Sequence, residues 1–282
     1  MNIGACLCGT VRYELDGPFT MMMHCHCSMC RKHHGAPFAT FVAAAHSGFR
    51  WRSGAETLAK YASSAQGART YCRHCGSVGP MLSPEADMAV VPAGNLDGDP
   101  GIRPQAHMFV GSKAAWYTIT DSLPRHEGLP PEFGGGLGLE RPVVAQREGV
   151  ADGSCLCGEV AFEYRAAQRM YQCHCSRCRR ARSAAHGANV FVKLDDFTFT
   201  RGEELVAQYK PPEAQRFTQA FCTRCGGKAP SAQRARGVVV VPAGTLDTDP
   251  LMRPQANIFV GSKAPWFEIT DSITQCAELP PS

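Results

Sequence analysis

The sequence predicts a mainly β protein made of two similar halves, in which small sheets are tied together by metal ions. Three observations predict this class: short stretches alternate apolar and polar residues between glycine and proline, helical periodicity is weak throughout, and one pattern of seven cysteines occurs twice. At 282 residues, with 44% hydrophobic and 19% charged residues, the chain has a globular composition and the length of about two domains.

The expected strands are short and lie between turn residues. The first alternates over 10–15 and ends before the turn at 17–18, and 159–164 is its counterpart in the second half. The one helical feature that we expect is a short turn after Cys30. Further strands are expected at 38–42, 49–52, 88–91, 116–120 and 197–200.

An internal repeat divides the chain. The segment 90–97 recurs at 240–247, and 109–116 recurs at 259–266, with an offset of 148 to 150 residues between equivalent cysteines. Four glycines within 134–138 are typical of a flexible linker. We therefore expect a first zinc-binding domain at 1–132, a glycine-rich linker at 133–149 and a second zinc-binding domain at 150–282.

Each half carries seven cysteines in one order: C-x-C, then C-x-C-x-x-C, then C-x-x-C-G. Fourteen cysteines in a duplicated pattern are too many for incidental buried thiols, and disulfides would leave one thiol unpaired in each half. One metal ion can hold several thiolates at such spacings. Cys276 aligns with His126, so we expect it to be incidental.

Seven cysteines divide naturally into four and three. The C-x-x-C-G knuckle turns both sulfurs toward one point, and C-x-C places two sulfurs on one face of a strand. Together they would close a structural zinc site, and the other three would leave one position of a second zinc open for water or a substrate. The expected structural ligands are Cys6, Cys8, Cys72 and Cys75, with Cys155, Cys157, Cys222 and Cys225; the open sites are Cys25, Cys27 and Cys30, with Cys173, Cys175 and Cys178.

A rival grouping remains for these ligands. Cys27 and Cys30 could join the knuckle as a ribbon, which would leave Cys6, Cys8 and Cys25 as the open set. We favour the first grouping because three ligands close together in the sequence cost less chain entropy to order.

The formal charge of +4 treats every thiol as neutral. Fourteen thiolates would add −14 and four zinc ions +8, which leaves about −2 and removes the simplest support for nucleic-acid binding. No apolar run approaches the roughly 20 residues of a membrane helix, and 1–6 lacks the features of a signal peptide. We therefore expect a cytoplasmic protein without a membrane partner, in which clustered cysteines indicate metal.

Four motifs surround the cysteines of the first half: G-A-C-L-C-G at 4–9, C-H-C-S-M-C-R-K at 25–32, C-R-H-C-G-S at 72–77 and A-G-N-L-D at 93–97. They resemble the glutathione-dependent formaldehyde-activating enzyme domain, a family that also includes centromere protein V. The resemblance implies two tandem β-tent domains with two zinc ions each, four per chain. It also implies structural and catalytic cysteines in the first grouping above. The resemblance covers both halves of the chain.

The resemblance implies a carbon–sulfur lyase similar to S-(hydroxymethyl)glutathione synthase. Such an enzyme adds a small thiol such as glutathione to formaldehyde or a related carbonyl, or does the reverse. An open zinc suits this reaction because it lowers the pKa of a bound thiol or polarises a carbonyl oxygen. The alternative is a non-catalytic zinc module that binds a partner. Open sites in both halves favour catalysis, because closed sites alone would serve a scaffold.

Residues around the open sites are further candidates. The basic pairs Arg31/Lys32 and Arg179/Arg180 could meet a substrate carboxylate or form a solvated turn. His26 and His174 could relay a proton, although we favour a positioning or exposed role. Lys113 and Trp116, with Lys263 and Trp266, are expected to fix a strand and the core.

The second half departs from the family pattern at several positions. Gly35 would let a ligand approach the open site, and Phe38 would give an apolar wall. We therefore expect the first half to carry most of the activity. Gly35, Phe38, Ser77 and His107 become Ser183, His186, Gly227 and Asn257 in the second half.

Overall fold

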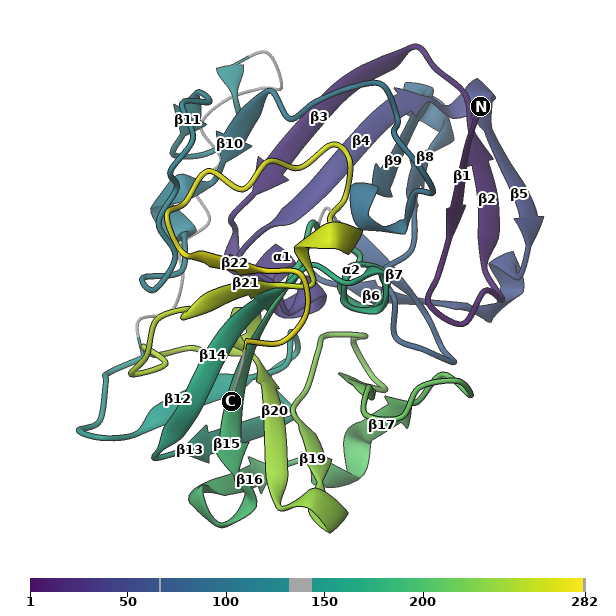
Figure 1. Ribbon diagram of the computed structural model, residues 1–282. Helices are drawn as coiled ribbons and strands as arrows, with labels where there is room; N and C mark the ends of the chain where they lie inside the picture. Colours follow the sequence, from purple (N-terminus) through teal and green to yellow (C-terminus); the bar gives the residue numbers. More distant parts are fainter. Residues whose placement is uncertain (66, 132–143, 281–282) are drawn as a thin grey trace.

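The computed structural model describes residues 1–65, 67–131 and 144–280. Most of the expected linker, 133–143, lies outside the described residues. The described chain is mainly β, with two short helices and several small sheets, which confirms the expected class. Each half contains a three-stranded, a six-stranded and a two-stranded sheet (Figure 1).

In the first half, the three-stranded sheet is antiparallel, and the six-stranded sheet is mixed because one strand runs parallel to both of its neighbours. A short helix, α1 (Ser28–His34), follows the strand that ends at Cys25. In spatial order the sheets are β1 (Asn2–Ala5), β2 (Arg12–Leu15), β5 (Phe49–Ser53); β11 (Arg125–His126), β10 (Ala106–Met108), β3 (Phe19–Cys25), β4 (Ala39–Ala45), β9 (Met88–Pro92), β8 (Met81–Ser83); and β6 (Leu58–Ala62), β7 (Ala68–Cys72).

The second half repeats this arrangement, with α2 (Ser176–Arg182) in the place of α1. Its parallel pairs are again at one end of the larger sheet. The sheets are β12 (Ala151–Ser154), β13 (Ala161–Tyr164), β16 (Phe197–Arg201); β19 (Ser231–Gln233), β20 (Val238–Pro242), β15 (Gly187–Lys193), β14 (Ala167–Cys173), β21 (Ala256–Ile258), β22 (Thr274–Cys276); and β17 (Val206–Tyr209), β18 (Gln219–Cys222).

The expected strands are present except for one. In the first half, the strands expected at 10–15, 38–42, 49–52 and 88–91 overlap β2, β4, β5 and β9. In the second half, those expected at 159–164 and 197–200 overlap β13 and β16. The strand expected at 116–120 is wrong, because this segment has no regular structure. The helical turn expected after Cys30 begins earlier, at Ser28, so Cys30 lies inside α1.

The two halves exchange tryptophans, one of which begins the segment 116–120. Trp116 of the first half packs into the core of the second half, with Phe162, Val190 and Val241. Trp266 packs into the core of the first half in the same way. The segment 116–120 lies in turn and irregular structure between the two halves. The cores of the two halves are therefore interdependent.

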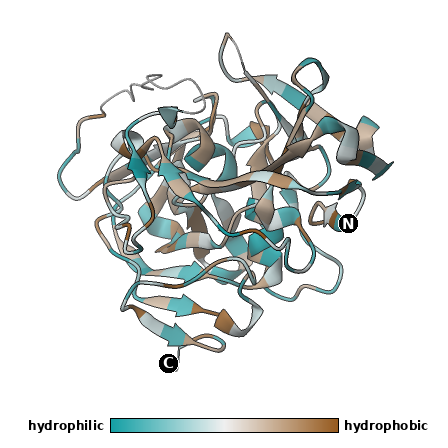
Figure 2. Ribbon diagram, turned by 90° about the horizontal axis from the view of Figure 1, so that it is seen from above, coloured by the Kyte–Doolittle hydropathy of each residue, from teal (hydrophilic) through white to brown (hydrophobic). Residues whose placement is uncertain are grey.

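The helices meet at the centre of the molecule (Figure 1), where His34 Nδ1 lies 2.8 Å from the carbonyl oxygen of Arg182. Apolar segments gather in the middle of the fold, and polar ones lie mainly at its edges (Figure 2). Within the described ranges, no helix combines the length and apolar character needed to cross a bilayer.

Candidate metal centres

The structure brings fourteen cysteines into four groups, and within each group the sulfur atoms lie within 4.8 Å of one another. Two groups have four members and join the turn after the first strand of a half to the knuckle that follows β7 or β18. The four-cysteine groups are Cys6, Cys8, Cys72, Cys75 and Cys155, Cys157, Cys222, Cys225; the three-cysteine groups are Cys25, Cys27, Cys30 and Cys173, Cys175, Cys178.

The knuckle in each four-cysteine group is a tight turn. Gly76 N–H donates to the carbonyl oxygen of Cys72 at 2.8 Å, and Gly76 adopts a φ of 71° that suits glycine. A Cβ on Gly76 would also lie 2.4 Å from the ring of Phe221 in the other half. The glycine after the second knuckle cysteine is therefore required by the turn and by the neighbouring half.

The sulfur spacing fits a tetrahedral metal ion better than disulfides. Cys6 and Cys8 sulfurs are 3.4 Å apart, and Cys8 and Cys72 sulfurs are 3.8 Å apart. A tetrahedron of thiolates at the usual zinc–sulfur distance has edges of about 3.8 Å. All fifteen cysteines are free, so the donor set is the one that zinc prefers.

The three-cysteine groups are built by a strand end and a helix start. Cys25 ends β3, Cys27 is the N-cap of α1, and Cys30 lies in its first turn. The Cys27 sulfur accepts a hydrogen bond from the backbone N–H of Cys30 at 3.3 Å, which fixes two members relative to each other. The second group has the same cap, from Cys178 to Cys175 at 3.4 Å.

An arginine lies beside each three-cysteine group: the half-buried Arg69 beside the first and the buried Arg182 beside the second. Burial lowers the pKa of Arg69, but the nearby Cys30, Cys27 and Cys25 thiolates raise it above its usual value. Burial lowers the pKa of Arg182 to about 10, although the Cys178 thiolate opposes the shift. Each guanidinium therefore offsets part of the negative charge of the neighbouring thiolates.

These two arginines were missed in the sequence because they do not align. Arg69 lies on β7, where the second half has Gln219, and Arg182 ends α2, where the first half has His34. Comparing the two halves identifies residues that occur at equivalent positions. It does not identify a positive charge that β7 supplies in the first half and α2 supplies in the second.

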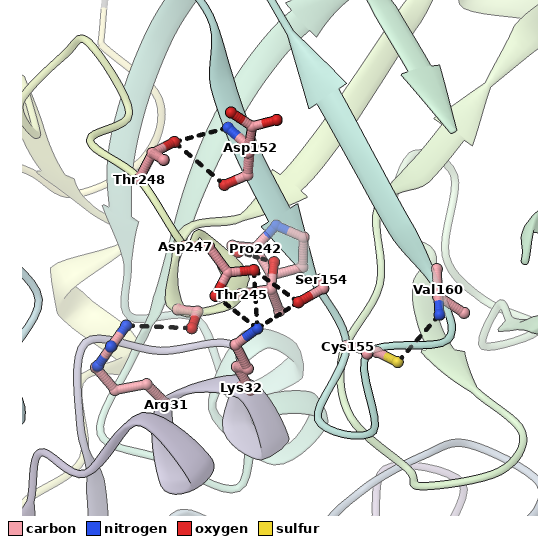
Figure 3. Close-up of polar contacts among 12 residues, drawn as sticks. Arg31, Lys32, Asp152, Ser154, Cys155, Val160, Pro242, Thr245, Asp247 and Thr248 are labelled. Atoms are coloured by element: carbon pink, nitrogen blue, oxygen red, sulfur yellow. Dashed lines mark hydrogen bonds and ion pairs between the residues drawn. The ribbon is translucent and has the colours of Figure 1, made fainter. Parts of the chain in front are cut away.

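The basic pair after the first three-cysteine group contacts the second half of the chain. Lys32 Nζ lies 2.7 Å from Asp247 Oδ1 and 2.5 Å from Ser154 Oγ, both in the second half (Figure 3). Arg31 donates to the carbonyl oxygen of Gly244 at 3.5 Å (Figure 3). Both side chains therefore hold α1 against the other half.

The second basic pair makes the reciprocal contacts. Arg179 donates to the carbonyl oxygens of Gly94 and Leu96 at 3.0 and 2.8 Å, and Arg180 pairs with Asp97. The A-G-x-L-D segments thus receive the helix of the opposite half. Both pairs therefore join the halves, and Arg180 also lines a pocket beside the second three-cysteine group.

His26 and His174 are buried and belong to matching hydrogen-bond chains. His26 Nε2 lies 2.8 Å from His107 Nδ1, and His107 Nε2 lies 3.0 Å from Asp121. The carboxylate accepts the His107 Nε2–H, so Nδ1 accepts from His26. Burial lowers the pKa of His26 to about 3, which keeps the ring neutral. The exposed alternative for His26 is wrong, and the chain positions the loop between Cys25 and Cys27.

In the second half Asn257 replaces His107 within the same chain. It accepts from His174 Nε2 at 2.9 Å and donates to Asp271 at 2.8 Å. The amide therefore bridges the histidine and the aspartate as the imidazole does. Asp121 and Asp271 had no motif in the sequence that pointed to this role.

Gly35 and Phe38 also lie between the halves. A Cβ on Gly35 would lie 2.7 Å from Lys228 Cγ of the second half. Phe38 packs on His186, with ring centroids 5.7 Å apart. Both residues contact the other half, and neither lines the pocket beside the second three-cysteine group, so they give no reason to place the activity in the first half.

The chain matches the family model described as glutathione-dependent formaldehyde-activating enzyme over residues 1–112 and 150–262. It belongs to this family. No curated protein matches the chain. Among solved structures it is similar to a crystal structure of a Rhodobacter sphaeroides protein, with 28% identity over 35% of this chain and 92% of that chain, and a TM-score of 0.29.

The two three-cysteine groups of this family member differ in access. The cysteines of the first are 2–3% exposed, whereas Cys175 is only half-buried. A pocket of about 1290 Å³ opens beside the second group and is lined by Cys173, Cys175 and Cys178. The second group can therefore be reached by a molecule the size of a small peptide.

Proposed function

We propose that this chain is a zinc-dependent enzyme that adds a small thiol, such as glutathione, to formaldehyde or a related carbonyl, or catalyses the reverse reaction. In the forward direction a sulfur–carbon bond forms, the carbonyl π bond breaks, and the thiol proton ends on the new hydroxyl oxygen. No oxidant or reductant is needed. The observation that carries the proposal is the second three-cysteine group, which opens into a large pocket in a member of this family.

The cysteines divide into structural and catalytic ligands in this proposal. The two four-cysteine groups would each hold a zinc ion that ties two distant parts of a half together. With one zinc ion in each three-cysteine group, the chain would bind four zinc ions. The three-cysteine groups would each hold a zinc ion by three thiolates. When bound there, zinc supplies an open position that lowers the pKa of a thiol or polarises a carbonyl oxygen.

The chain's own residues prepare this site. The N-cap bond from Cys178 N–H to the Cys175 sulfur holds two ligands in place. The His174–Asn257–Asp271 chain holds the loop between Cys173 and Cys175. Arg182 is 6% exposed and places a positive charge beside the Cys178 and Cys173 thiolates. A thiol that enters the pocket therefore meets a preformed set of donors.

The test is exchange between glutathione, formaldehyde and their adduct, followed by two-dimensional NMR. The zinc-loaded protein should raise the exchange rate above the uncatalysed rate. A variant with both Cys27→Ala and Cys175→Ala should return it to that rate. Uncatalysed exchange in the wild-type protein would reject the enzyme and favour a non-catalytic zinc module.

A further inference from the structure

The pocket beside the second three-cysteine group is strongly basic. Its described lining includes Arg169 on β14, Arg177 on α2, Lys193 on β15, Arg216, and Arg236 after β19, and all five side chains are exposed. Arg180 and Arg182 also line it, but they are bound to Asp97 and Asn189. Glu213, which pairs with Arg177 at 3.4 Å, is the one carboxylate among the described lining residues.

The fold does not require these charges. By the offset of the neighbouring cysteines, the first half has Met21, Met29 and Ala45 in the places of Arg169, Arg177 and Lys193. Arg236 corresponds to Ala86. The same strands and the same helix form in both halves with neutral residues at these positions. The charges are therefore particular to the second half, where Arg169 also lies over the ring of Phe191 and Arg236 donates to Gln233.

The first three-cysteine group is covered by apolar side chains instead. Its cysteines share a cluster with Met23, Phe41, Met108 and Phe109, all buried. Met21, Met29 and Met81 pack on the outside of that cluster. Asn189 replaces Phe41 and Ser231 replaces Met81 in the second half, so two of the covering groups become polar there. The two three-cysteine groups therefore have the same cysteines and differ in the side chains that surround them.

We propose that the second three-cysteine group is the substrate site and takes an anionic thiol, whose carboxylate or phosphate groups bind Arg169, Arg177 and the neighbouring basic side chains. The first group is closed to thiols and holds its metal ion only. This inference rests on the proposed function. It adds that the second half binds the thiol and that positively charged side chains recognise it. A multiply charged anion fits because several cations face one pocket with one opposing carboxylate.

The test is calorimetric binding of glutathione to the zinc-loaded full-length protein without formaldehyde. We expect one glutathione per chain and an affinity that falls as salt is raised, because exposed charges are screened. Arg169→Met with Arg177→Met, the residues of the first half, should weaken binding by about fivefold or more. Lys193→Ala with Arg236→Ala should act in the same direction, and these sites are distant in sequence from the cysteines.

Matched controls separate charge from other effects. Arg165 is exposed in the same half and does not line the pocket, so Arg165→Ala should leave binding unchanged. Glutathione diethyl ester keeps the thiol but loses both carboxylate charges, and it should bind weakly to wild type and variants alike. Coenzyme A replaces carboxylates with phosphates, and stronger arginine-dependent binding of this probe would assign phosphate as the preferred anion.

Three results would overturn the inference: two glutathione molecules per chain, equal binding of glutathione and its ester, or full affinity in both double variants. Arginine-dependent binding without catalysed adduct exchange would instead reject the proposed reaction and leave the binding site standing. The two failures are therefore distinguishable.

Discussion

Lys32 Nζ of the first half lies 2.7 Å from Asp247 Oδ1 of the second, and Arg180 pairs with Asp97 in the reciprocal position. Each pair joins the helix that carries one three-cysteine group to the opposite half. Cys30 and Cys178 are thus placed by contacts that their own half does not make. The geometry of each candidate metal site depends on both halves.

Asp247→Asn should destabilise the protein. The Lys32 and Asp247 side chains are only 14% and 19% exposed, so the change leaves a largely buried ammonium without its charged partner. The free energy of unfolding should fall by about 1–3 kcal/mol in denaturant titrations. Asp99→Asn, which breaks the exposed pair with Arg103, is the control and should change stability little. Equal effects of the two changes would contradict the structural role of the buried pair.

Trp116→Ala should weaken the second half, although Trp116 belongs to the first. The side chain is 4% exposed within the other core, and loss of such a side chain costs about 3–5 kcal/mol. Hydrogen exchange should become faster in β15 and β20. Trp266→Ala is the reciprocal control and should act on β4 and β9. Faster exchange confined to the half that carries the substitution would refute the exchange of tryptophans.

Lys228 should make stability rise with pH. Its side chain is fully buried and donates to the carbonyl oxygen of Gly76 at 2.5 Å, and burial lowers its pKa from 10.5 to about 7. Between these two pKa values the unfolded chain binds a proton that the folded chain does not. Stability therefore increases with pH over this window, by up to about 1.4 kcal/mol per pH unit.

Lys228→Met isolates this contribution. The stability advantage of the variant over wild type should be largest below pH 7 and shrink as the pH rises toward 10. Unfolding titrations at several pH values measure it. A difference that stays constant over the range would mean that Lys228 remains charged in the folded protein.

The two kinds of cysteine group should respond differently to serine. Cys72→Ser opens a group that joins residues 64 positions apart, so it should lower the thermal midpoint sharply or prevent soluble expression. Cys27→Ser keeps a hydroxyl that can still cap α1 and should cost much less stability. Elemental analysis should find four zinc ions per wild-type chain. A Cys27→Ser protein that melts while Cys72→Ser stays stable would reverse the assignment of structural sites.

The repeat and the cysteine spacing predicted the class of fold and the residues that come together. Cys6 and Cys72 could be linked from the sequence because the knuckle and C-x-C patterns each fix local geometry. Contacts between the halves could not be predicted, because Trp116 and Arg31 look like ordinary residues of their own half. The charge beside each three-cysteine group was also hidden, since Arg69 and Arg182 occupy unrelated positions.

Access to the sites depended on residues that carry no motif. Phe38 and Gly35 stood close to the cysteines in sequence, yet they face the other half. Met29 and Arg177, at equivalent positions, do distinguish access to the two groups. Met29 belongs to the apolar cover of the first group, and Arg177 lines the basic pocket beside the second. Such a difference emerges only when strands from several parts of the chain are placed around the site.

The most direct test of the account compares Cys27→Ala with Cys175→Ala in the full-length, zinc-loaded protein. Exchange of the glutathione–formaldehyde adduct is followed by NMR for each variant. We predict that Cys175→Ala abolishes catalysed exchange and that Cys27→Ala retains most of it, because only the second group opens to the large pocket. Loss of exchange in Cys27→Ala with full exchange in Cys175→Ala would contradict the account.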